Sequence, residues 1–264
     1  MKFAQMLGAV ALASVTGLAQ ATVVIFDNNS GGVAKAGDVL TGTGGSVKTS
    51  GDAYGSALGF GDFVVTAGIS TANKNLAQPG FNTTNHIDPN VSGVVYQDVD
   101  PKHGGLGAYT AGDDSRFNRD TDNLEPNVYS SSAGDEILFF NFSFDVILDQ
   151  VWFNGGHSEH TGISEAGNPT MFNIFYSLDG INYSSVFAPA SNGLSQRTPT
   201  DSEFLMTGLN TGYSYYAIAA TGWNDAPGGY IEAIGYSSVP EPGSLFLLGL
   251  GLLGLAAARR RTAQ

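Results

Sequence analysis

The last segment of the chain, from Val239 to Arg261, limits what the rest of the sequence can fold into. It begins with Val239-Pro240-Glu241-Pro242, continues without charge from Gly243 to Ala258, and ends with three arginines. Proline fixes its own φ and restricts the residue before it, so two prolines around one glutamate disfavour both helix and strand. We therefore expect a folded body that ends near Ser238, followed by an extended and accessible segment.

The uncharged run after the prolines has the composition of a membrane helix. Glycines at 249, 251 and 254 disfavour a helix in water but are common in membrane-spanning helices. As a helix, Gly243–Ala258 would span about 24 Å, which is short of a hydrocarbon core of about 30 Å. Arg259, Arg260 and Arg261 would stay on the cytoplasmic side and leave everything upstream on the far side. The alternative is a buried C-terminal helix of a soluble domain.

A proline-glutamate-proline motif, a short membrane segment and a basic cluster, in this order, closely resemble the PEP-CTERM sorting signal of bacterial exosortase systems. The resemblance implies that an exosortase, a membrane peptidase, cuts the chain near Pro240–Pro242. It also implies transient anchoring in the inner membrane, followed by release or transfer of the upstream domain to the cell envelope or extracellular matrix. On this basis residues 239–264 are the sorting signal.

The N-terminus predicts export independently. Lys2 supplies a positive charge, Met6–Leu18 is mostly apolar, and Ala19-Gln20-Ala21 fits the small-residue cleavage site of a secretory signal peptide. We therefore expect residues 1–21 to direct Sec export and to be removed by signal peptidase. Residues 22–238 then form the secreted domain. Because the chain has no cysteine, that domain must be stabilised by core packing, with bound ions as a further possibility.

The charge of the secreted domain excludes one class of partner. Setting aside Lys2, Glu241 and the three terminal arginines leaves 7 basic and 23 acidic residues, a net charge of −16. Such a domain repels the phosphate backbone, so we expect no nucleic-acid partner. The chain also contains 36 glycines. Many glycines with few charges are typical of an extracellular β-protein that has many turns.

Short apolar runs separated by turn residues predict an all-β fold. We expect a two-sheet antiparallel β-sandwich, similar to a jelly roll, rather than strands alternating with helices. Asp98–Ser132 is a long polar segment, whose length is unusual for a loop unless it binds something or packs in an ordered way. The predicted strands are Val23–Phe26, Phe63–Val65, Val94–Tyr96, Glu136–Phe142, Val146–Leu148, Val151–Phe153, Phe172–Tyr176, Tyr183–Phe187, Glu203–Met206, Tyr213–Ala220 and Tyr230–Ile234.

One predicted hairpin carries a second resemblance. The sequence from Phe175 to Tyr183, Phe-Tyr-Ser-Leu-Asp-Gly-Ile-Asn-Tyr, is similar to a hairpin of galactose-binding-like jelly rolls, the group that includes discoidin and carbohydrate-binding modules. Asp179-Gly180 suits a tight turn, and aromatic residues on either side would pack across the strands.

Candidate ion-binding residues lie in the polar segment. Asp120 and Asp122 belong to a group of acidic residues, and calcium prefers clusters of oxygen ligands in loops. They are the candidate ligands of a structural calcium ion, although a complete EF-hand pattern is missing and solvated acidic loops are the alternative. His157 and His160 lie close together among glycines, but the His-Glu-x-x-His order of a zinc protease is absent.

Aromatic residues suggest carbohydrate binding more strongly than any motif suggests catalysis. Trp152, Trp223, Tyr215, Tyr216 and Tyr230 are candidates for a sugar-stacking surface, although most of them are expected in the core. Trp223 lies in a predicted loop, and with Asp225 it forms the candidate ligand site. No Gly-x-Ser-x-Gly nucleophile motif occurs. We therefore expect a noncatalytic module that is structural or interacts with exopolysaccharide; a lectin-like module and a carbohydrate-active enzyme using acidic loop residues remain alternatives.

Overall fold

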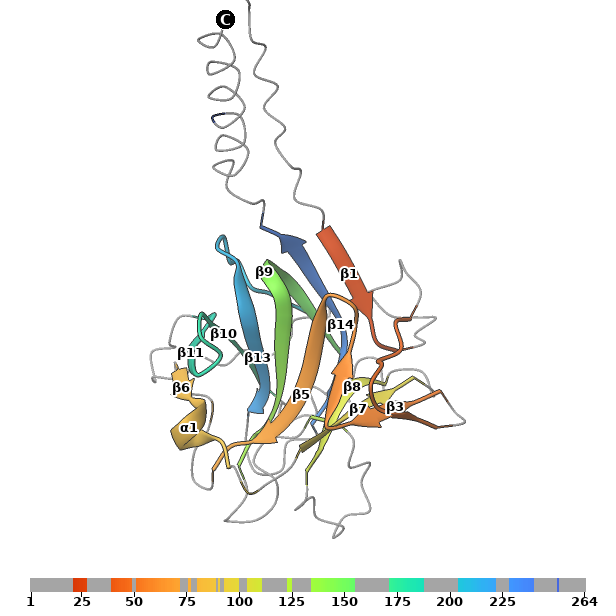
Figure 1. The fold of residues 1–264 in the computed structure, drawn as a ribbon. Coiled ribbons are helices and arrows are strands. Elements are labelled where there is room, and N and C mark those ends of the chain that lie inside the picture. Colours follow the sequence, from red (N-terminus) through yellow and green to blue (C-terminus); the bar gives the residue numbers. More distant parts are fainter. Residues whose placement is uncertain are drawn as a thin grey trace, which may run out of the picture. The chain divides into compact units, whose positions relative to one another are not determined.

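The computed structural model describes residues 21–27, 39–48, 51–71, 76, 80–88, 90, 93–99, 104–110, 123–124, 134–154, 171–187, 204–221, 228–239 and 251. Ala21–Ser238 belong to one compact unit. Its described part is almost entirely β-structure, so the all-β prediction is confirmed (Figure 1). Across the residues described, no helix is long and apolar enough to span a membrane.

The named strands pair antiparallel throughout. One short helix, α1 (Thr83–His86), follows β6. The strands are β1 (Ala21–Ile25), β2 (Ser46–Val47), β3 (Ala53–Gly55), β4 (Ala57–Gly59), β5 (Phe63–Ile69), β6 (Gly80–Asn82), β7 (Gly93–Asp98), β8 (Gly105–Thr110), β9 (Glu136–Asn154), β10 (Met171–Ser177), β11 (Asn182–Ser185), β12 (Phe204–Met206), β13 (Tyr213–Thr221) and β14 (Tyr230–Ser238).

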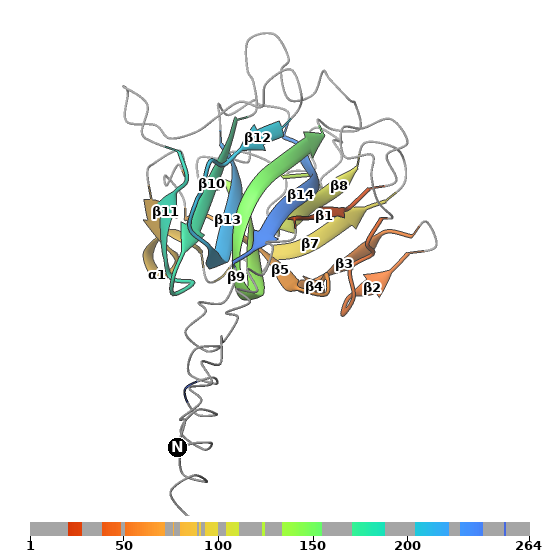
Figure 2. The same cartoon turned by 90° about the horizontal axis from the view of Figure 1, so that it is seen from above.

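Strand β9 belongs to two layers of the fold. Its first half pairs with β5 and β13, and its second half pairs with β14 and β12. The first layer therefore has the order β6-β11-β10-β13-β9-β5-β4, and the second has the order β2-β3-β7-β8-β14-β9-β12, with β1 also on β14. Figure 2 shows β9 running between β13 and β14. The predicted sandwich is thus a single hydrogen-bonded sheet that folds over itself through β9.

The continuity of β9 corrects the sequence prediction, which divided this region into three strands. The residues between them, including Asp145 and Asp149, remain in extended backbone inside one strand of 19 residues. Register shifts show where the strand bends. The pairing with β13 jumps from Asn141 to Val146, and the pairing with β14 shifts beside Gln150. Polar residues that indicate turns in sequence therefore mark bulges of a strand here.

The main core lies between the two layers and is rich in aromatic rings. Phe153 of the second layer stacks on Phe172 of the first with ring centroids 4.0 Å apart. Phe63 of β5 meets Tyr236 of β14 edge to face at 6.2 Å. Such pairs add about 0.5–1.5 kcal/mol each beyond the area that they bury. This packing supplies the stabilisation that a chain without disulfides requires.

A second apolar cluster lies on the outer face of the first layer. Phe81 of β6 covers Phe175 of β10 with centroids 4.9 Å apart, and Ile137 of β9 is fully buried in the same cluster. The side chain of Phe81 and that of Ile87, which follows helix α1, therefore cover one part of this outer face. The neighbouring part of the same face is open and forms a hollow.

The structure adds elements that the sequence did not predict. Strand β8 lies inside the polar segment 98–132, and its residues pair with β7 from Asp98 to Gly93. The short strands β2, β3 and β4 occupy a stretch that is rich in glycine and threonine and has few apolar residues. Helix α1 has only four residues and an Asn82 cap, too little sequence for a helical periodicity to show.

Candidate functional site

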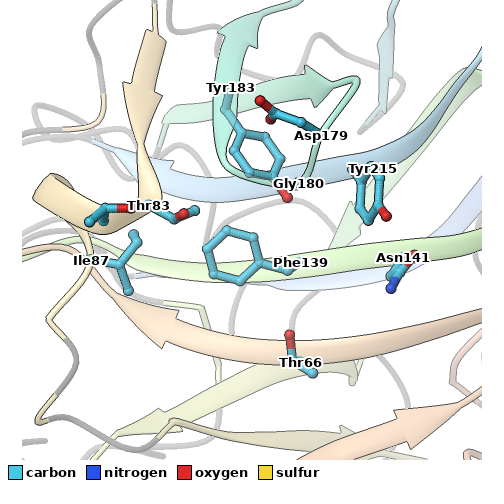
Figure 3. A pocket seen from close by; sticks show the side chains of 10 residues that line it. Thr66, Thr83, Ile87, Phe139, Asn141, Asp179, Gly180, Tyr183 and Tyr215 are labelled. Atoms are coloured by element: carbon cyan, nitrogen blue, oxygen red, sulfur yellow. The ribbon is translucent and has the colours of Figure 1, made fainter.

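A hollow of about 640 Å³ lies on the outer face of the first layer, between the β10–β11 hairpin and helix α1 (Figure 3). Its lining residues come from segments far apart in the sequence. They are Thr66 of β5, Thr83 and Thr84 of α1, Ile87, Phe139 and Asn141 of β9, Asp179 and Gly180 of the hairpin turn, Tyr183 of β11 and Tyr215 of β13.

Aromatic rings form the apolar part of the hollow. Phe139 is half-buried, and its ring lies 5.7 Å from that of Tyr183. Tyr183 in turn stacks on Phe81, with centroids 4.8 Å apart and planes within 2°. Figure 3 shows the rings of Phe139, Tyr183 and Tyr215 arranged around the same space. Because Tyr183 and Phe81 are buried, this wall is held by packing and does not have to be ordered when a ligand binds.

Hydroxyl and amide groups lie beside these rings. Thr66 pairs with Phe139, and Asn141 pairs with Val64 two residues away, so Thr66 and Asn141 stand on neighbouring strands. Both side chains are exposed. Thr83 and Thr84 begin helix α1, where the Asn82 Oδ1 accepts a hydrogen bond of 2.9 Å from the Thr84 amide. The hollow therefore combines ring faces with several uncharged hydrogen-bonding groups.

The hairpin turn that forms one wall is locked by Asp179. Its Oδ1 accepts hydrogen bonds from the amides of Ile181 and Asn182 at 2.8 and 2.7 Å, and its Oδ2 accepts one of 2.7 Å from the Asn182 side chain. These bonds stabilise the charged carboxylate and hold the pKa of Asp179 well below its usual range, with the Asn182 amide as the largest cause. The predicted Asp-Gly turn is confirmed.

Gly180 brings this turn against Tyr215. Its φ of +71° is left-handed, a conformation that glycine adopts without steric cost. A Cβ at this position would lie 3.1 Å from two atoms of the Tyr215 ring. The absence of a side chain thus permits both the turn and the close contact that positions the ring.

The lining of the hollow consists mainly of groups that stack and form hydrogen bonds. Asp179 contributes the one carboxylate among its lining residues, and both of its oxygens are engaged in the turn. A general acid needs a pKa near the working pH, and the pKa of Asp179 is shifted in the opposite direction. Within the described parts of the chain, no group of three His, Cys, Asp or Glu side chains is placed to hold a metal ion.

Several predicted aromatic candidates lie in the core instead. Tyr216 and Tyr230 are fully buried, and Trp152 is 8% exposed, which agrees with the expectation that most of this group lies in the core. Tyr215 alone among the described candidates lines the hollow. Tyr183 and Phe139 were both predicted as strand residues, and neither was predicted to take part in binding. The alternation Ile137, Phe139, Asn141 is the signal that could have placed Phe139 and Asn141 together on one face.

The remaining predicted site residues lie outside the described residues. They are the candidate calcium ligands Asp120 and Asp122, the candidate ligand site Trp223 and Asp225, the motif residues Pro240, Glu241 and Pro242, and the arginines 259–261. The same holds for the signal peptide up to residue 20 and, except for Gly251, for the predicted membrane segment. Val239, the first residue of the motif, directly follows β14 and is 37% exposed. The regular strand therefore ends where the prolines predicted.

Comparison with protein families detects the PEP-CTERM protein-sorting motif at residues 238–261. The detected range begins at the last residue of β14 and includes both prolines and all three terminal arginines. No curated protein and no solved structure matches the chain. The similarity to galactose-binding-like jelly rolls therefore stays a prediction.

Proposed function

We propose that this chain, a PEP-CTERM sorting-signal protein, brings a noncatalytic carbohydrate-binding module to the extracellular matrix. Its sorting motif makes it an exported protein that is anchored transiently in the membrane and sorted by an exosortase. The body upstream of the motif is the part that remains to act after sorting. Its binding partner would be a matrix polysaccharide, held in the hollow on the first layer.

The hollow is the observation that supports this function. Carbohydrates present apolar ring faces and a periphery of hydroxyl groups, so they bind where aromatic rings lie beside uncharged donors and acceptors. Phe139 and Tyr215 offer ring surface, while Asn141 and Thr66 offer an amide and a hydroxyl. The site lies on strands rather than on long loops, which keeps these groups in fixed positions.

Binding is tested with the full chain in a detergent that carries no sugar headgroup, against an array of immobilised oligosaccharides. Tyr215→Ala should weaken binding of the retained glycans about tenfold, because it removes one ring of the hollow. Tyr109→Ala is the matched control, since Tyr109 is an exposed tyrosine on β8 of the second layer. Equal binding by both variants and the unchanged protein would reject the hollow as the site.

The rival function, a carbohydrate-active enzyme, is separated by analysing the same glycans after incubation. A binding module returns them unchanged, whereas hydrolysis or transfer products detected by mass spectrometry would establish an enzyme. The sorting step has its own test in a host with the matching exosortase. We expect exported protein that lacks residues 245–261, and intact C-termini on all exported protein would contradict processing at the proline motif.

A further inference from the structure

The residues that line the hollow differ in charge from those of a site for acidic polysaccharides. Hydroxyl, amide and aromatic groups make up most of the lining, Asp179 supplies a negative charge, and no lysine or arginine is among the ten residues. A site for uronate or sulfate groups would require cations, usually arginine, to balance the ligand's charge. We infer that the hollow selects uncharged glycans and disfavours acidic ones, an inference that rests on the proposed carbohydrate binding.

Asp179 is a fixed negative charge and does not become neutral when a ligand approaches. Three hydrogen bonds from Ile181 and Asn182 stabilise its ionised form, and the Ser177 hydroxyl donates a fourth of 3.0 Å to its Oδ1. Protonation would weaken these bonds. A carboxylate on a bound sugar would therefore meet an ionised group on the hairpin at neutral pH.

The rest of the described structure does not offset this charge near the hollow. Lys48 is the single lysine or arginine within the described ranges, and it belongs to the second layer next to β2. Its ammonium group lies 4.4 Å from the centroid of the Tyr96 ring and donates a hydrogen bond to the Tyr96 hydroxyl. The Lys48 ammonium group thus interacts with β7 in the second layer. The secreted domain as a whole carries a net charge of −16 between residues 22 and 238, which adds a long-range repulsion toward polyanions.

The uncharged groups of the hollow match the demands of a neutral sugar. Thr66 and Asn141 stand on adjacent strands and are both exposed, so their hydroxyl and amide can donate and accept toward sugar hydroxyls. The rings of Phe139 and Tyr215 present apolar surface on the same side of the sheet, as Figure 3 shows. Neutral glycans would then be selected because they stack on these rings, while the carboxylate of Asp179 repels acidic glycans.

The test compares oligosaccharides in pairs that have the same ring configuration and differ at C6 in a charged or an uncharged group: oligogalacturonate with its methyl ester, and oligoglucuronate with the corresponding oligoglucose. Binding is measured with the full chain at low and at high salt, beside the neutral oligosaccharide array. We expect neutral members to bind, with acidic members at least about threefold weaker at low salt, the factor produced by like charges about 6 Å apart in water. High salt should reduce this difference.

The Asp179→Asn variant tests whether the Asp179 carboxylate is the group that discriminates against acidic glycans. Asparagine keeps an oxygen to accept the turn hydrogen bonds and is itself favoured before glycine in tight turns, so the hairpin should persist. We expect the ratio of affinities for the neutral glycan and its acidic partner to fall to about one, whatever the variant does to binding of the neutral glycan itself. Asp149→Asn is the control with the same change of net charge, because Asp149 bonds Ser237 in the second layer. It should keep the discrimination.

Each outcome has a separate meaning. Equal or tighter binding of the acidic members would overturn charge selection but leave carbohydrate binding in place. Discrimination that survives Asp179→Asn, or that Asp149→Asn removes as well, would overturn the assignment to the hairpin carboxylate. If no member of any pair and no glycan of the array is bound, the proposed function fails together with this inference.

Discussion

Replacing Tyr216 by phenylalanine tests how β9 passes from one layer to the other. The Tyr216 hydroxyl is buried in the core, donates a hydrogen bond of 2.6 Å to the Val146 carbonyl and accepts one of 3.2 Å from the Leu148 amide. Val146 is also the residue at which the pairing between β9 and β13 changes register. The hydroxyl therefore satisfies two backbone groups at the bend.

The expected cost follows from those two groups. Phenylalanine keeps the ring packing but leaves a buried N–H and a buried C=O without this partner, and each such loss costs about 1–3 kcal/mol. We expect Tyr216→Phe to lower the free energy of unfolding by about 2–4 kcal/mol, the lower part of the sum, because a local shift can restore part of the bonding. For a domain of this size that corresponds to a decrease in Tm of about 4–16 °C.

The control is a second tyrosine of the same core. The Tyr236 hydroxyl donates a hydrogen bond of 2.8 Å to the exposed carboxylate of Asp62, which water can solvate when the hydroxyl is removed. Tyr236→Phe should therefore cost less, about 0.5–1.5 kcal/mol. Both variants are compared with the unchanged protein by denaturant unfolding and by thermal melting. A Tyr216→Phe variant that is as stable as Tyr236→Phe would refute the claim that this hydroxyl holds the bend.

Three further outcomes are expected. Burial raises the pKa of Tyr183, Tyr216 and Tyr236 above the ordinary value of 10.0, so each stays protonated in the folded state while it ionises in the unfolded chain. Their contribution to stability is fully present below pH 10 and decreases by about 1.4 kcal/mol per tyrosine and pH unit above it, which denaturant unfolding at pH 9 and pH 11 measures. Gly180→Ala should lower the free energy of unfolding by about 1–2 kcal/mol, because alanine does not readily adopt the left-handed backbone of this position. It should also weaken glycan binding, because the new Cβ would meet the ring of Tyr215. Unchanged melting and binding would contradict both expectations. Changing Arg259–Arg261 to glutamate should make the sorting segment lose its orientation or fail to stop in the membrane, so cell fractionation should find less protein held in the membrane. The Tm of the soluble body should not change.

The sequence predicts the strands of this fold better than it predicts their continuity. Period-two alternation and turn residues located most of the long strands, including β10 and β13, because one face of each strand packs against a core. Asp145 and Asp149 suggested that β9 was three strands, since polar residues between apolar runs usually mark turns. In the structure they lie on the exposed or half-exposed side of one strand where the register shifts. A bulge and a turn have the same local composition, and only the partner strands distinguish them.

The hollow was beyond prediction for a related reason, because sheet register rather than sequence proximity creates it. Thr66 meets Phe139 through the β5–β9 register, and Tyr215 reaches Asn141 through the β9–β13 register just before the pairing shifts. A change of one residue in either register would turn the corresponding side chains to the core face and replace them with apolar neighbours. The bulge in β9 therefore has a consequence on each side of the sheet. It sends the strand into the second layer, and it ends the regular pairing beside Asn141, where the outer face is left open.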